Sequence, residues 1–139
     1  MFLYITIGCN DLARAKRFYD AVMPTIGHVL RGQDDSEIGY GPPDAPRTPF
    51  WITLPFDGKP ATVGNGSMPA FDAPTRAAVD AFYRAALATG GSDEGAPGLR
   101  PLGQNFYACY VRDPDGNKLS AVCERQEDEQ ALAPLPALA

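Results

Sequence analysis

Few side chains in this sequence are suited to nucleophilic catalysis or to metal binding. There is one histidine, His28, and there are three cysteines, Cys9, Cys109 and Cys123. His28 has no partner at a chelating spacing, and no adjacent His or Lys points to an activated thiolate. The odd number and wide spacing of the cysteines argue against a disulfide framework. We therefore expect reduced, buried thiols and a structural or solvent-exposed histidine.

The segment Asp113-Pro114-Asp115-Gly116-Asn117 has the oxygen-bearing side chains of a calcium loop. Three such residues are too few for the six to eight oxygens that calcium usually takes. Asp and Asn side chains also accept hydrogen bonds from turn amides, and Gly suits the tightest point of a hairpin. The segment therefore predicts a turn between two strands.

The sequence contains an internal repeat. Phe18-Tyr19 and Phe82-Tyr83 lie 64 residues apart, and residues 4–19 can be laid over residues 68–83 at that offset. Both copies read as a strand, a polar break, a helix with an aromatic pair, and a glycine stop. A repeat of this length indicates two supersecondary modules, in which the aromatic pairs pack helix against sheet.

The pattern of apolar residues assigns elements to each module. The first module, about 2–54, is expected to contain strands over 2–9, 28–33, 36–41 and 50–54, with a helix over 12–23 capped by Asn10 or Asp11. The second module, about 67–124, is expected to contain strands over 67–72, 106–112 and 118–124, with a helix from Pro74 to about Ala88. Residues 55–66 connect the modules, 92–103 are expected to be a loop, and 126–139 form a C-terminal tail after a single domain over 1–125.

Composition narrows the class of protein. The 139 residues are 45% hydrophobic, which is enough for one domain with a real core. The net charge of −5 argues against a nucleic-acid partner, because phosphate binding needs clustered Lys and Arg. No apolar run approaches the roughly 20 residues that span a bilayer, and no signal peptide precedes the first strand. With reduced cysteines, we expect a cytoplasmic protein.

Asp11-Leu12 followed by Phe18-Tyr19, the repeat at Phe82-Tyr83, and the 113–117 turn together resemble the vicinal oxygen chelate superfamily. This is the glyoxalase, bleomycin-resistance and extradiol dioxygenase group, and the similarity covers nearly everything except the tail. The resemblance implies an α+β fold in which two tandem βαβββ modules form a curved, cleft-bearing mixed sheet with helices on the outside. It also implies a homodimer.

The resemblance further implies metal ligands on the first and last strands of both modules. Tyr4 and Met68 stand where His is expected, Ser120 stands where an acid is usual, and 51–53 contain no carboxylate or imidazole. A phenol, a thioether and a hydroxyl are poor ligands for a catalytic divalent ion. We therefore predict no metal site of the family type and no cofactor.

Alternation places Tyr4 and Thr6 on one face of the first strand of module one, and Met68, Ala70 and Asp72 on the equivalent face in module two. If these faces point away from the helices, as the resemblance implies, they line a ligand pocket. Trp51 is expected to pack in the core, although a role as a pocket wall stays open. Arg100 could neutralise an anionic ligand, although a solvated position is expected. Tyr4 and Met68 could also simply fill the space of a former metal site. The predicted pocket residues are Tyr4, Thr6, Trp51, Met68, Ala70, Asp72, Ser120 and Val122.

An apolar and aromatic pocket with few polar groups suits a small organic molecule. The sequence therefore favours a metal-independent binding protein. A glyoxalase-like lyase or dioxygenase-type enzyme with unrecognised chemistry is the alternative. A metal-free enzyme that uses Tyr4, Asp72 or Ser120 as an acid or a base is also open, but the sequence shows no clear dyad or triad.

Overall fold

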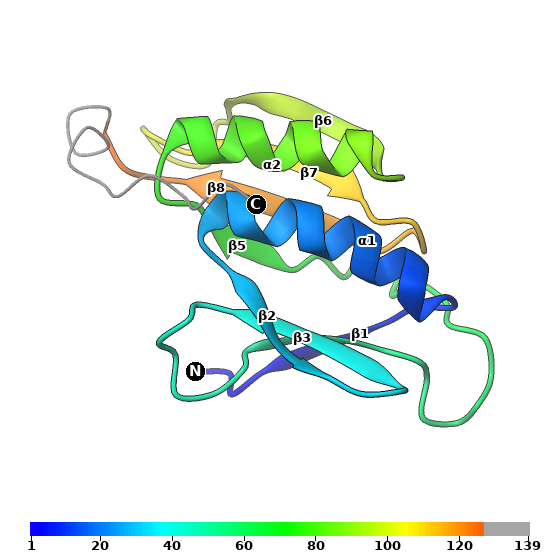
Figure 1. Ribbon diagram of the computed structural model, residues 1–139. Coiled ribbons are helices and arrows are strands. Elements are labelled where there is room, and N and C mark those ends of the chain that lie inside the picture. The colour runs from blue at the N-terminus through cyan, green and yellow to red at the C-terminus, as the bar shows by residue number, and fades with distance from the viewer. Residues whose placement is uncertain (127–139) are drawn as a thin grey trace.

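Two βαβββ modules follow each other along residues 1–126, the part of the chain that this computed structural model describes (Figure 1). Module one consists of β1 (Ile5–Gly8), α1 (Leu12–Val22), the short 3₁₀ helix η1 (Met23–Ile26), β2 (Val29–Gln33), β3 (Glu37–Gly41) and β4 (Phe50–Thr53). Module two consists of β5 (Ala70–Asp72), α2 (Arg76–Ala88), β6 (Ser92–Leu99), β7 (Tyr107–Arg112) and β8 (Lys118–Cys123). The α+β class and the tandem βαβββ plan are thus confirmed. The expected tail lies outside the described residues apart from Gln126, and the domain boundary at 125 stays a prediction.

The repeat extends to the strand order. The strands form two open four-stranded sheets, in the order β1-β4-β3-β2 and β5-β8-β7-β6. In both sheets the first strand pairs in parallel with the last, and the other pairs are antiparallel. Each module therefore leaves its own first strand, β1 or β5, at a sheet edge.

Side-chain caps begin both helices. The Asp11 carboxylate accepts a hydrogen bond from the Arg14 amide at 3.0 Å, and the Thr75 hydroxyl accepts one from the Ala78 amide at 3.0 Å. Each bond satisfies an amide that has no partner within the helix. Of the two caps expected for the first helix, the structure uses Asp11.

Aromatic side chains join the two modules in one core. The Phe50 and Phe71 rings lie 5.0 Å apart between centroids, and Phe71 lies 6.0 Å from Phe82. Tyr19 meets Phe50 at 5.6 Å. The helices α1 and α2 also contact each other, so neither module has a separate core. The expectation that the aromatic pairs pack helix against sheet is confirmed for Phe18 and Phe82, which are fully buried.

The 113–117 segment forms the expected turn. The Gly116 amide donates to the Asp113 carbonyl at 2.9 Å, and the Asp113 side chain accepts from the Asp115 and Asn117 amides at 2.9 Å. Gly116 has a φ of 92°, a left-handed backbone conformation that glycine adopts without steric cost.

This turn also attaches module two to module one, a role that its sequence did not indicate. Four hydrogen bonds among the described residues do so. They run from Tyr19 Oη to Asp113 Oδ2 at 2.6 Å, from Arg14 Nη2 and the Asn10 amide to Asp115 Oδ1 at 2.7 and 2.9 Å, and from Asn117 Nδ2 to the Gly8 carbonyl at 2.8 Å. The turn therefore fixes the end of β1 relative to β8.

The expectation of a loop over 92–103 is wrong for 92–99, which form β6. This strand contains Gly95, Pro97 and Gly98, and its pairing with β7 shifts register on both sides of Gly95. Glycine and proline weaken the alternating signal of a strand. Tertiary pairing with β7 therefore determines this element. No helix within residues 1–126 is long and apolar enough to cross a bilayer.

Candidate ligand-binding cleft

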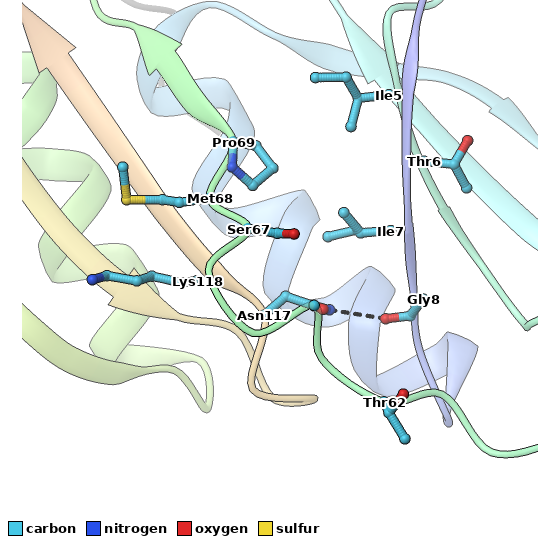
Figure 2. A pocket seen from close by; sticks show the side chains of 11 residues that line it. Ile5, Thr6, Ile7, Gly8, Thr62, Ser67, Met68, Pro69, Asn117 and Lys118 are labelled. Carbon is cyan, nitrogen blue, oxygen red and sulfur yellow. Dashed lines mark hydrogen bonds between the residues drawn. The ribbon is translucent and has the colours of Figure 1, made fainter.

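A cleft of about 510 Å³ opens between β1 and the segment that leads into β5 (Figure 2). Its apolar lining comes from Ile5 and Ile7 on one side and from Met68 and Pro69 on the other. The two sides belong to different modules. The cleft therefore exists only because the module edges approach each other.

The polar lining of this cleft contains several donors. Thr62 and Ser67 contribute hydroxyl groups from the connection between the modules, and Thr6 contributes another from β1. Lys118 is the charged residue of the lining, and none of the described residues that line the cleft is an Asp or a Glu. Asn117 closes one end through its bond to the Gly8 carbonyl.

Backbone groups at the two strand edges add to these donors. Ile5 and Cys9 donate their amides toward β4, to the carbonyls of Pro49 and Thr53, at 2.8 and 2.9 Å. In a parallel ladder the alternate residues point the other way, so the Thr6 amide and carbonyl face away from β4, on the cleft side. By the same alternation, Ala70 presents its backbone groups at the open edge of β5. A ligand between the strands can thus meet both side-chain and main-chain polar groups.

The eight predicted pocket residues do not share one place. Thr6 and Met68 line the cleft. Ala70 and Asp72 line a smaller pocket of about 200 Å³, which shares Ile5 and Pro69 with the cleft. Ser120 and Val122 lie beside Ala70 and Asp72 in the sheet register, and neither lines the cleft or the smaller pocket.

Tyr4 and Trp51 lie outside the residues that line the cleft. Tyr4 precedes β1 and is 54% exposed. Trp51 shares a sheet face with Thr6 and Gly39, and its ring covers Gly32 and Gly39. A Cβ at Gly39 would approach the Trp51 ring to 2.7 Å. Trp51 therefore packs against neighbouring strands on the side of the sheet opposite Phe50 and Ile52.

Sequence reasoning missed most of the cleft lining. Ile5 and Ile7 alternate with Thr6, so they were expected to point toward the helices. Because β1 is an edge strand, side chains from both of its faces can border the gap beside it. Thr62 and Ser67 lie in or beside a segment read only as a connection, and no local signal marked them.

The residues present do not fit a family-type metal centre. At the positions where ligands are expected, Tyr4 lies outside the cleft lining, Met68 offers a thioether, and Ser120 is a fully buried hydroxyl. Among residues 1–126, no three His, Cys, Asp or Glu side chains gather where they could hold a metal ion. Soft or neutral donors of this kind do not match the imidazole and carboxylate ligands of catalytic divalent ions.

Burial favours the neutral forms of Cys9, Cys109 and His28. Burial, followed by the charges of Asp115 and Asp113, raises the pKa of the Cys9 thiol to about 11. Burial raises the pKa of Cys109 to about 11 as well. Burial lowers the pKa of His28 below its usual value, and the nearby Asp72 only partly opposes this shift. Neither thiol is therefore a ready nucleophile at neutral pH.

Comparisons with known proteins agree with this fold. The sequence model of the Glyoxalase/Bleomycin resistance protein/Dioxygenase superfamily matches residues 2–120. A glyoxalase/bleomycin resistance protein from Albidiferax ferrireducens T118 is 41% identical, with a TM-score of 0.80, over 91% of this chain and 99% of that one. No curated protein matches the sequence.

More distant structures share the fold alone. A glyoxalase-related enzyme from Fulvimarina pelagi is 20% identical, with a TM-score of 0.68, over 98% of this chain and 96% of that one. Lactoylglutathione lyase from Agrobacterium tumefaciens is 21% identical, with a TM-score of 0.58, over 88% and 92%. Since the family model covers most of the sequence, the chain belongs to the Glyoxalase/Bleomycin resistance protein/Dioxygenase superfamily.

Proposed function

We propose that this chain is a metal-independent protein that binds a small organic molecule in the cleft between β1 and β5. The observation that supports this proposal best is the cleft lining. It combines apolar walls from Ile5, Ile7, Met68 and Pro69 with a few hydrogen-bond donors. Pockets for organic ligands typically have this composition, in which apolar area gives affinity and a few polar groups give orientation.

The alternative is a glyoxalase-like lyase or dioxygenase-type enzyme with unrecognised chemistry. The name of the Agrobacterium tumefaciens relative, a lactoylglutathione lyase, invites it. His28 and Asp72 line the same small pocket, and His28 would be its general base. Burial lowers the pKa of His28, so the imidazole is a neutral base at pH 7. Turnover that is lost in both His28→Gln and Asp72→Asn would establish this alternative.

A homodimer and a cytoplasmic location belong to the same proposal. Apolar side chains project from the first residues of the chain, with Phe2 73% exposed and Leu3 69% exposed. A contiguous exposed apolar patch marks an interaction surface, and we infer that these neighbouring side chains belong to one. The three cysteines are free and buried, which suits a reducing compartment.

The test is a thermal-shift screen of aromatic and aliphatic metabolites, on protein purified without chelators and analysed for bound metal. Met68→Trp should fill the cleft and weaken a hit at least about tenfold, equivalent to about 1.4 kcal/mol. Leu87→Trp is the matched control, since Leu87 is 40% exposed on α2 and Met68 is 38% exposed. Near-stoichiometric zinc, nickel, iron or manganese would contradict metal independence. A hit unaffected by Met68→Trp would place the ligand elsewhere.

A further inference from the structure

Two cations flank one tyrosine on the face of the β5–β8 sheet opposite α2. Cys109 and Val111 of β7 are buried in the core, so Tyr110 between them points to the other face. The Arg100 guanidinium carbon lies 5.5 Å from the centroid of the Tyr110 ring, and Lys118 Nζ lies 5.6 Å from it. Arg100 follows β6 and Lys118 begins β8, so the cations reach the ring from neighbouring strands on either side of β7.

These two charges are not cancelled by carboxylates. Among residues 1–126, neither Arg100 nor Lys118 forms an ion pair, whereas Arg112 on the same face is paired with Glu94 at 2.7 Å. A tyrosine ring holds a cation through its π electrons but leaves the positive charge in place. Arg100 is also anchored through a hydrogen bond to the Ala96 carbonyl. The pair is therefore positioned and positively charged, in a protein whose net charge is −5.

One member of the cation pair belongs to the cleft. Lys118 lines the cleft, and Figure 2 shows the Lys118 and Met68 side chains extending in the same direction, away from β1. Ser120 is the cross-strand neighbour of Tyr110 and the next residue after Lys118 on this face. Its hydroxyl is fully buried and has no hydrogen-bond partner among the described residues. A polar group in that state is unfavourable unless a ligand or water satisfies it.

We propose that the ligand is a small organic anion. Its carboxylate or phosphate-type group binds Lys118 and Arg100 beside Tyr110, and its apolar part lies against Ile5, Ile7 and Met68 in the cleft. This inference rests on the proposed function and narrows its ligand class. A guanidinium can bind two anionic oxygens side by side, and an ammonium can add a third contact.

The test compares 4-phenylbutyrate with its neutral isostere 4-phenylbutyramide, using titration calorimetry or ligand-observed NMR. Phenyl phosphate serves as a third probe that separates carboxylate from phosphate recognition. The wild type should bind one of the anions about tenfold or more tightly than the amide. Lys118→Met and Arg100→Met should each remove most of that preference. Lys59→Met and Arg17→Met are the matched controls, because they remove the same charge from exposed positions elsewhere.

The outcomes separate this inference from the proposed function. If the amide binds as tightly as both anions and Met68→Trp blocks it, the cleft binds organic ligands but the anion site is wrong. If anion binding depends on Lys118 and Arg100 but not on Met68, the anion site stands and the cleft proposal fails. An anion preference that survives both cation substitutions, or no binding of any probe to folded protein, overturns the inference.

Discussion

Tyr19 and Tyr83 occupy equivalent positions in the two modules but have different surroundings. Tyr19 is fully buried and donates to Asp113 at 2.6 Å, whereas Tyr83 is only partly buried and donates to Asp93 at 3.0 Å. Burial and then the charge of Asp113 raise the pKa of Tyr19 well above its usual value. At the residue scale, the repeat therefore preserves the side chain while its environment changes.

Tyr19→Phe should lower the free energy of unfolding by about 1–3 kcal/mol, because buried Asp113 loses a donor that it cannot replace with water. Tyr83→Phe is the control, and it should cost less than about 0.5 kcal/mol at its more solvated position. Urea unfolding followed by circular dichroism measures both. Equal effects of the two substitutions would show that the Tyr19–Asp113 bond has no special role.

His28 should make folding sensitive to acid. Because burial lowers its pKa in the folded state, the unfolded chain binds the proton more readily. The contribution of neutral His28 to the free energy of unfolding is therefore complete above the unfolded-state pKa of about 6.5. It is lost as the pH falls toward the lower folded-state pKa.

His28→Gln should remove the part of the pH dependence of stability that arises from histidine, because the chain contains no other histidine. Unfolding free energies of both proteins, measured from about pH 7.5 to about pH 5, give the comparison. The carboxylates are common to both proteins, so their titration largely cancels in the difference. Parallel pH profiles for the two proteins would contradict a partly buried His28 with a lowered pKa.

At the scale of elements, the packing of Trp51 depends on glycines in two neighbouring strands. Gly39 of β3 and Gly32 of β2 lie beneath the indole, and an added Cβ at either position would come within 2.7 Å of it. Glycine is required there because of close approach to a side chain, since neither residue has a positive φ.

Gly39→Ala should displace Trp51 and lower stability by about 1–3 kcal/mol, the usual cost of overpacking. Trp51 is the single tryptophan, so a shift in its fluorescence emission reports the displacement directly. Gly103→Ala is the control, because its Cβ would meet the nearest atom at an ordinary 3.4 Å. An unchanged emission spectrum in Gly39→Ala would show that the indole does not depend on this glycine.

At the scale of the whole molecule, the exposed N-terminal side chains lead to a prediction about assembly. We expect a homodimer in sedimentation velocity at micromolar concentration. Replacing both Phe2 and Leu3 with Ser should shift the protein toward monomer, because it removes apolar area that burial in an interface would stabilise. Replacing the similarly exposed Leu102, at 67%, with Ser is the control for a general change in surface polarity. A wild-type monomer at all concentrations would exclude the dimer.

Much of the fold could be predicted from local patterns, and much less of the site could. The Phe18-Tyr19 and Phe82-Tyr83 pairs gave the module repeat because helix and strand periodicity is a local property. The strand β6 was missed because glycines and a proline hide its alternation. Ile7 and Lys118 were missed as lining residues because their role depends on which sheet edges meet.

The sequence by itself determined the module repeat, the aromatic residues of the core and the turn at 113–117, since each follows from local spacing and side-chain chemistry. Only the tertiary structure decided where the cleft lies and that Lys118 and Arg100 flank Tyr110. Those features arise from contacts between strands and modules far apart in the chain, so their geometry depends on packing that no local pattern records. The positions where the family's metal ligands are expected were visible in the sequence. The sequence did not show that these positions lie apart, with Tyr4 on an exposed segment, Met68 on a cleft wall and Ser120 at a buried position of a sheet.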